Sequence, residues 1–232
     1  MIARLLSAVA FAGLAYALPL VGTSILAHDF RPWLAILSAL CLVFAQPTLS
    51  KEEARATRAH DRGSAPLIMV CSLASQIAAT VELRAATGEL RAATGVSAAA
   101  GVSAAAGVSA ANAAAVGCGV ALVLLGSAIR VAAIDTLGKA FTASVRVDAG
   151  HRLVERGIYR RVRHPSYLGA LLALVGVPVV FSAWWAAGFT VVIMSAAYAR
   201  RIRLEERALV ERHGDVYREY RRRTAGLVPG VW

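Results

Sequence analysis

Long apolar stretches alternate with short basic segments along this chain of 232 residues. The first stretch, Leu5 to Leu26, is long enough to cross a hydrocarbon core of about 30 Å. A cleaved signal peptide is the alternative, since Arg4 precedes the stretch and Ala27 resembles a cleavage position. A second apolar stretch, Trp33 to Ala45, follows after a very short turn that contains Pro32, and this favours a retained first span.

Three segments of different composition follow. Gln46 to Ala65 mixes lysine and arginine with acidic residues, and the positive-inside rule places it in the cytoplasm. Pro66 to Val81 is a third apolar segment, short for a span. Residues 82–112 contain two copies of Glu-Leu-Arg-Ala-Ala-Thr-Gly and then two copies of Val-Ser-Ala-Ala-Ala-Gly, units too short and too few for a solenoid. We expect this insert to be a loop or a frayed helical extension without chemistry.

The C-terminal half holds one further span and one longer apolar block. Ala113 to Ala133 is the span, and a basic, loop-like region from Asp135 to Pro165 follows it. The block from Tyr167 to Tyr198 is too long for one ordinary span and short for two. Because Pro178 and Ser182-Ala-Trp-Trp185 interrupt its middle, it predicts a tight, tilted helical hairpin. Arginines at both ends of the block place both ends in the cytoplasm.

These segments predict an all-α, polytopic transmembrane bundle of six spans with both termini inside. Five spans follow if the third segment does not cross. The expected organisation has three parts: N-terminal spans with a basic cytoplasmic loop at residues 1–81, the repeat insert at 82–112, and a membrane core with cytoplasmic C-terminal helices at 113–232.

Composition and charge agree with a membrane protein. The hydrophobic content of 58% exceeds what the core of a soluble domain needs, while a formal net charge of +11 is concentrated beside the apolar stretches. Nucleic-acid binding is disfavoured, because the basic segments flank spans and contain no recognisable binding module. The cysteines show no metal or disulfide spacing. The excess of arginine over lysine, with abundant alanine and glycine, suggests a GC-rich genome and hence a bacterial inner membrane.

Candidate chemistry flanks the predicted hairpin. In Arg163-His-Pro-Ser-Tyr-Leu-Gly169, Pro165 suits the first turn of a helix and His164 its cap, where free backbone amides can meet a polar ligand group. A helix entry with interfacial His and Tyr but no ligand is an equally good interpretation. Arg201 and Glu205 lie one helical turn apart, as an ordinary surface pair would. Since the hairpin returns them to the side of His164, we expect them to converge with it on one pocket.

The pattern Arg-His-Pro-x-Tyr-x-Gly, then a hydrophobic hairpin, then Glu205-Glu206, resembles the signature of the isoprenylcysteine carboxyl methyltransferases and the related phospholipid N-methyltransferases. Upstream elements also fall where that family has them: Leu137-Gly138, Phe141, His151-Arg-Leu-Val154 and Gly157-Ile-Tyr159. The resemblance covers about residues 127 to 232, and the repeat insert departs from it.

The resemblance implies a membrane methyltransferase that uses S-adenosylmethionine, with no metal and with its site facing the cytoplasm. The acceptor it implies is the carboxylate of a lipophilic, isoprenylcysteine-like molecule, either a small molecule or a prenylated terminus. Arg201 would face this acceptor, and no residue is assigned as catalytic. The implied cofactor-binding residues are His151, Leu153, Val154, Tyr159, His164, Pro165, Ser166, Tyr167 and Glu205.

Two alternatives stay open at this point. The acceptor can be a phospholipid amine or a lipid-like hydroxyl, and an amine would need a base such as His164 or Glu206. The second alternative is a non-catalytic membrane protein that keeps the fold. A transporter is disfavoured, because Arg31 and Arg130 are almost the only ionisable residues of the spans and lie near span ends. We expect most arginines of residues 200–223 to contact anionic membrane lipids.

Overall fold

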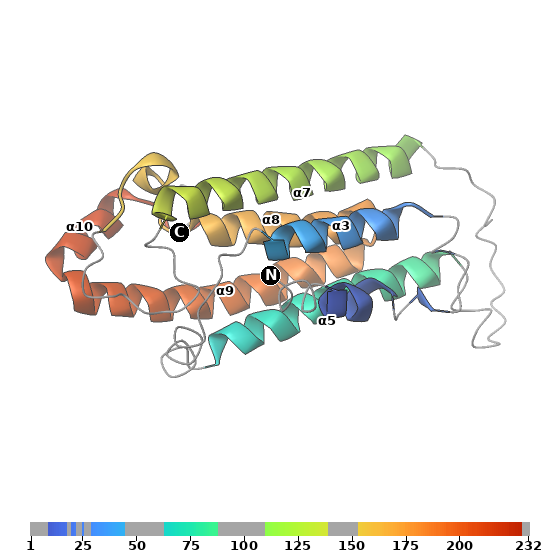
Figure 1. Ribbon diagram of the computed structural model, residues 1–232, viewed down its shortest axis with the longest axis horizontal. Helices are drawn as coiled ribbons and strands as arrows, with labels where there is room; N and C mark the ends of the chain where they lie inside the picture. The colour runs from blue at the N-terminus through green and yellow to red at the C-terminus, as the bar shows by residue number, and fades with distance from the viewer. Residues whose placement is uncertain are drawn as a thin grey trace.

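The described part of the protein is a bundle of helices (Figure 1). The computed structural model describes residues 9–17, 20–21, 25, 29–44, 63–87, 110–138 and 153–228. The helices are η1 (Gly13–Ala17), α3 (Arg31–Phe44), α5 (Ser64–Ala86), α7 (Ala110–Leu137), η4 (Gly157–Arg160), α8 (Pro165–Val180), α9 (Trp184–His213) and α10 (Asp215–Arg223). In these ranges the β-structure is one isolated bridge, between Val162 and Ala225. The predicted all-α class is confirmed for this part of the chain.

Two helices of the described ranges are long and apolar enough to cross a membrane. They are Ser64–Ala86, which is α5, and Ala113–Leu137, which is most of α7. The apolar helix α8 is shorter, with 16 residues. Length and composition thus support two crossings in this part of the chain.

Most of the described N-terminal residues are helical. Residues 9–17 end in the π-helix η1, and α3 begins at Arg31. Pro32, which the sequence placed in a turn, instead occupies the first turn of α3, where its missing N–H costs no helical hydrogen bond. Asp29 holds this start by accepting hydrogen bonds from the backbone N–H and the guanidinium of Arg31. The rest of the predicted first span and residues 45–62 lie outside the described ranges.

The third apolar segment is longer than the sequence predicted. We expected residues 66–81, short for a span, whereas α5 has 23 residues and continues to Ala86. Glu82 does not end the helix, because its carboxylate accepts hydrogen bonds from the backbone N–H groups of Trp185 at 3.3 Å and Ala186 at 2.8 Å. These N–H groups lie in the first turn of α9 and have no acceptor within their own helix. The helix α5 therefore enters the predicted repeat insert, of which residues 88–109 are outside the described ranges.

Four glycines bring α7 and α8 into backbone contact. A Cβ atom at Gly119 would lie 2.7 Å from the carbonyl oxygen of Gly176, and one at Gly126 would lie 2.4 Å from that of Gly169. On each helix the two glycines are seven residues apart, so both pairs fall on one face. Small residues allow such close packing between apolar helices. This glycine seam sets the register of α7 along α8.

The predicted hairpin within residues 167–198 is present. α8 ends at Val180 and α9 begins at Trp184. Between them, the N–H of Ser182 donates to the carbonyl of Val179 and the N–H of Ala183 donates to the carbonyl of Pro178. α9 then has 30 residues and continues to His213, well past the end of the apolar block.

A side chain from α5 compensates for the proline inside α8. Pro178 has no N–H, so the carbonyl of Leu174 loses its helical hydrogen bond. The amide of Gln76 donates to this carbonyl at 3.3 Å, and the amide oxygen of Gln76 accepts the hydroxyl of Tyr16 at 3.1 Å. An unsatisfied backbone group in hydrocarbon costs several kcal/mol. Gln76 therefore allows Pro178 to sit within an apolar helix.

Candidate functional site

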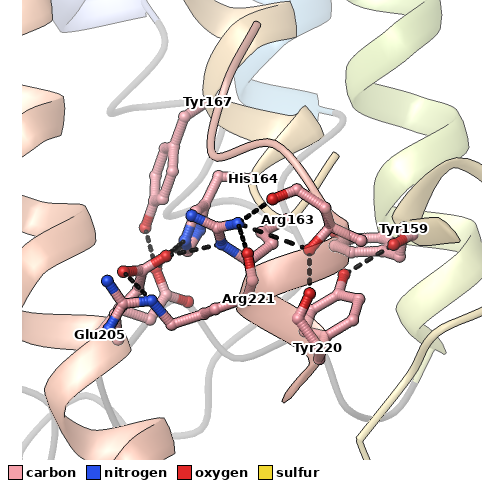
Figure 2. Close-up of polar contacts among 9 residues, drawn as sticks. Tyr159, Arg163, His164, Tyr167, Glu205, Tyr220 and Arg221 are labelled. Carbon is pink, nitrogen blue, oxygen red and sulfur yellow. Dashed lines mark hydrogen bonds and ion pairs between the residues drawn. The ribbon is translucent and has the colours of Figure 1, made fainter. Parts of the chain in front are cut away.

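Five helices meet at one end of the bundle. Ser64 begins α5, Leu137 ends α7 and Pro165 begins α8 at this end, while the second half of α9 and then α10 pass beside them (Figure 1). Figure 2 shows the polar side chains that converge there, from η4, the start of α8, α9 and α10.

Tyr167 joins the two segments that the sequence predicted to converge. Its hydroxyl donates a hydrogen bond to Oε2 of Glu205 at 3.0 Å (Figure 2) and accepts one from Nε of Arg201 at 3.2 Å. Arg201 is not part of an exposed surface pair, since it is only 4% exposed and its Nη1 also donates to the hydroxyl of Ser64 at 2.9 Å. The hairpin therefore places the hydroxyl of Tyr167, in the first turn of α8, against both Arg201 and Glu205 of α9.

The imidazole of His164 lies between two adjacent glutamates. Its Nε2 is 3.3 Å from Oε1 of Glu206, and its Nδ1 is 3.8 Å from Oε2 of Glu205. The ring stacks on Tyr167 with centroids 5.8 Å apart, and Tyr167 packs on Tyr198 with centroids 5.2 Å apart. These three rings form a continuous aromatic layer beside Glu205.

Glu206 is the anionic centre of a buried cluster. Its Oε1 accepts a hydrogen bond from Nε of Arg163 at 2.8 Å, and its Oε2 lies 3.4 Å from Nε of Arg221 on α10. Burial alone would raise the pKa of Glu206, but the hydrogen bonds with His164 and Arg163 outweigh it and lower the pKa to about 2. Glu205 is more open, with 28% of its side chain exposed. The two adjacent glutamates thus have different environments.

The chain after α10 returns to the start of α8 and holds it. The N–H of Arg163 donates to the carbonyl of Ala225 at 2.8 Å, and the N–H of His164 donates to the carbonyl of Gly226 at 3.0 Å. In return, the N–H of Ala225 donates to the carbonyl of Arg161 at 3.0 Å. Sequence reasoning missed this contact, because pairing through backbone atoms leaves no pattern of side chains.

Tyr159, one of the predicted cofactor residues, is fixed by α10. The hydroxyl of Tyr220 donates to the carbonyl of Tyr159 at 2.7 Å (Figure 2). Burial raises the pKa of Tyr220 to about 12. Burial and then the charge of Glu205 also raise the pKa of Tyr159, so its ring lies within electrostatic reach of that carboxylate.

The remaining predicted cofactor residues have less direct support. Pro165 is fully buried in the first turn of α8, as expected. Leu153 and Val154 are half-buried in a segment without regular secondary structure that precedes η4. His151 lies outside the described ranges. A role for Leu153, Val154 and His151 at the cofactor stays a prediction.

Arg130 is a buried cation at the site that sequence reasoning left aside. It is 8% exposed, and its Nη1 donates to the hydroxyl of Ser166 at 2.9 Å and to the carbonyl of Ser166 at 3.1 Å. Its Nε is buried and has no hydrogen-bond partner among the described residues. The available signal was a lone arginine in an apolar span. The glycine seam explains its place, because it sets α7 against the first turns of α8.

Comparison with known proteins supports the predicted resemblance. The family model of the isoprenylcysteine carboxyl methyltransferase (ICMT) family matches residues 119–211. Protein-S-isoprenylcysteine O-methyltransferase A of Arabidopsis thaliana is 37% identical over 115 residues, which are 49% of this chain and 58% of the relative. The Saccharomyces cerevisiae protein-S-isoprenylcysteine O-methyltransferase is 30% identical over 127 residues, 49% of this chain and 48% of the relative. The chain thus spans about half the length of these relatives.

The fold extends the similarity beyond the matched sequence. The solved structure of the eukaryotic intramembrane Ras methyltransferase ICMT aligns with a TM-score of 0.61 over 97% of this chain and 75% of that chain, at 20% identity. At that identity the alignment shows the fold. The predicted resemblance to the ICMT family is therefore confirmed in sequence over residues 119–211, and the fold is similar to that of the solved structure.

Proposed function

We propose that this chain is a membrane methyltransferase that transfers a methyl group from S-adenosylmethionine to the carboxylate of a lipophilic, isoprenylcysteine-like acceptor. The observation that carries the proposal is the junction of Arg201, Tyr167 and Glu205, within a hairpin whose sequence matches the ICMT family. The relatives' names supply the type of reaction. The arrangement of this chain's own side chains supports the cofactor and the class of acceptor.

The site suits a cationic, donor-rich cofactor. When bound, S-adenosylmethionine supplies a methyl group activated by a positively charged sulfur. The partly exposed carboxylate of Glu205 can accept hydrogen bonds from hydroxyl or ammonium groups. We assign cofactor contact to His151, Leu153, Val154, Tyr159, His164, Pro165, Ser166, Tyr167 and Glu205.

Two buried arginines favour a carboxylate as the acceptor. Arg201 reaches the first turn of α8 from α9, and Arg130 reaches it from α7. A buried guanidinium is costly without an anionic partner, and Nε of Arg130 has no partner among the described residues. An acceptor carboxylate would supply one. We infer that Arg201 and Arg130 orient this group.

Positioning is then the main task of the site. A carboxylate is already ionised at neutral pH, so its attack on the methyl carbon needs no general base. Holding its oxygen about 3 to 3.5 Å from that carbon, in line with the departing sulfur, lowers the barrier by several kcal/mol. Transfer to this oxygen would form a C–O bond and break the C–S bond of the cofactor, whose sulfur would keep the electron pair.

An amine acceptor fits the site less well. An amine must lose a proton before it attacks, and Glu206 is one of two candidate bases nearby. With a pKa of about 2 and with Arg163 and Arg221 against its oxygens, Glu206 holds a proton weakly. It is therefore a poor base, and only His164 would remain for the task.

We place the site at the cytoplasmic face of the bacterial inner membrane. Arginines at 160–163 and 200–203 flank the hairpin at the site's end, and the positive-inside rule puts this end in the cytoplasm. Six crossings with both termini inside agree with the loop charges. A polar cofactor then enters from the cytoplasm, and the lipid tail of the acceptor enters between helices from the bilayer.

Titration of the detergent-purified protein with S-adenosylhomocysteine tests the cofactor. We expect the wild type to bind and Glu205→Ala to weaken binding at least about tenfold, the effect of roughly 1.4 kcal/mol. Glu219→Ala is the matched control, since Glu219 is 61% exposed on α10 and pairs only with Arg222 in the described structure. A wild type that does not bind overturns the proposal.

A second experiment identifies the bond that is formed. Membranes are incubated with methyl-labelled cofactor, and the labelled lipid fraction is treated with mild alkali. A methyl ester releases volatile labelled methanol, whereas methylated amines and ethers keep their label. Label that resists alkali would exclude a carboxylate acceptor.

A further inference from the structure

Glu205 and Glu206 follow each other on α9, yet they face different nitrogens of the same imidazole. Oε1 of Glu206 is 3.3 Å from Nε2 of His164, within hydrogen-bond range, and Oε2 of Glu205 is 3.8 Å from Nδ1, beyond it. Glu206 has only 12% of its side chain exposed, against 28% for Glu205. One glutamate therefore holds the ring, and the other stands at the open side of the site.

We propose that Glu206 is a positioning residue, which accepts the Nε2–H of His164 and thereby leaves Nδ1 as a hydrogen-bond acceptor for the cofactor. The inference rests on the proposed methyl transfer and adds a residue to which the family resemblance gave no role at the cofactor. Glu206 itself need not touch the cofactor. It acts through the imidazole.

The surroundings of Glu206 determine which nitrogen carries the hydrogen. An ionised carboxylate can only accept hydrogen bonds, so the nitrogen that faces it must be the donor. Arg163 at 2.8 Å and Arg221 at 3.4 Å keep Glu206 ionised, as its low pKa indicates. A neutral imidazole has one N–H, and hence Nδ1 carries a lone pair. The tautomer is assigned from this hydrogen-bond network.

The ring of His164 is packed on one face, and its backbone is held by the chain after α10. One face of His164 stacks on Tyr167 at 5.8 Å between centroids, and the His164 backbone N–H is bound to the carbonyl of Gly226. Besides Glu205 and the two arginines, the buried phenol of Tyr217 on α10 lies within electrostatic reach of Glu206. The charged and titratable groups around the imidazole thus come from the start of α8, from α9 and from α10. Nδ1 of the imidazole faces Glu205.

Two acceptors side by side select a ligand group with two donors. The lone pair of Nδ1 and the Glu205 carboxylate can together bind vicinal hydroxyls or an ammonium group. S-adenosylmethionine carries both kinds of group. If the hydrogen moved from Nε2 to Nδ1, the ring would turn an N–H toward the hydroxyl or ammonium group of the cofactor. Two donors would then face each other, and cofactor binding would weaken.

The variant Glu206→Leu tests the tautomer, because its side chain offers Nε2 no acceptor. Glutamine would not serve, since its amide oxygen could still accept from Arg163 and from Nε2 of His164. We expect the nitrogen NMR spectrum of ligand-free protein with labelled histidine to show the Nε2–H tautomer for His164 in the wild type. Glu206→Leu should lose this signature, and His164→Asn identifies the signal. An unchanged tautomer in Glu206→Leu overturns the inference.

Affinity for S-adenosylhomocysteine then separates positioning from folding. Glu206→Leu should weaken binding about tenfold, while Glu219→Leu, at an exposed glutamate of α10, should not. In a His164→Asn background, Glu206→Leu should cause no further loss, because the residue acts through the ring. An equal loss in both backgrounds would show that Glu206 acts through the packing of α10, contrary to the inference.

The outcomes also separate this inference from the proposed function. A wild type that does not bind S-adenosylhomocysteine overturns both. A wild type that binds, together with an unaffected Glu206→Leu, overturns the positioning role and leaves the proposed function standing.

Discussion

The guanidinium of Arg130 lies 2.9 Å from the hydroxyl of Ser166. This contact joins the last turns of the membrane-length helix α7 to the first turn of α8, which follows His164 and contains Tyr167. The two residues are 36 positions apart in the chain, and the glycine seam between α7 and α8 is what aligns them. The apolar packing of α7 on α8 thereby places the buried guanidinium of Arg130 at a polar site.

Replacing Arg130 should affect the acceptor more than the cofactor. In Arg130→Gln we expect the KM for a carboxylate acceptor to rise about tenfold or more, because a charge-assisted contact contributes about 1.5 to 3 kcal/mol. The affinity for S-adenosylhomocysteine should stay within about twofold. Arg203→Gln, at an exposed position of α9, is the control for loss of positive charge. A loss of cofactor affinity with unchanged KM would place Arg130 at the cofactor instead.

The glycine seam can be tested with two alanine substitutions in the same helix. In Gly126→Ala the new Cβ would meet the Gly169 carbonyl oxygen at 2.4 Å, whereas nothing lies within 4 Å of a Cβ at Gly117. We expect Gly126→Ala to lower the free energy of unfolding by about 1 to 3 kcal/mol through overpacking. Gly117→Ala should be neutral, or stabilising by up to about 1 kcal/mol. Thermal unfolding in detergent measures both, and equal midpoints would contradict the seam.

The link between Gln76 and the proline of α8 predicts a non-additive pair. The test uses a Tyr16→Phe background, which removes the other hydrogen bond of Gln76. In this background Gln76→Leu leaves the Leu174 carbonyl unpaired and should lower the free energy of unfolding by about 1 to 3 kcal/mol. Adding Pro178→Ala restores a helical N–H for that carbonyl. The cost of Gln76→Leu should then shrink. Strictly additive unfolding energies would show that Gln76 does not compensate for Pro178.

Acid should remove the stabilisation that Glu206 provides. Its pKa in the folded protein, about 2, lies below the ordinary value of 4.5, so the unfolded chain binds more protons as the pH falls. The stabilisation is complete above about pH 5 and is lost as the pH falls from there toward 2; it amounts to about 3 kcal/mol. The stability difference between the wild type and Glu206→Gln should therefore shrink in acid. A difference independent of pH between 6 and 3 would contradict the low pKa.

Much of this architecture is visible in the chain itself. The apolar block with Pro178 near its middle predicted the hairpin, and the motif around His164 predicted the start of α8. The third apolar segment was misjudged as short because the repeat insert, which starts at Glu82, was taken to follow it. The partners of Glu82, the first N–H groups of α9, are about a hundred residues away and cannot be inferred from local composition.

The sequence by itself determined the helices, the turn of the hairpin and the residue types of the site, because hydrophobic periodicity, proline and charge act over a few residues. Only the tertiary structure decided that Arg201 and Glu205 share the Tyr167 hydroxyl, that Arg130 reaches Ser166, and that adjacent glutamates take opposite sides of His164. These relationships depend on helix register and on close backbone packing at glycines. Such packing is a property of pairs of helices, and neither helix specifies it alone.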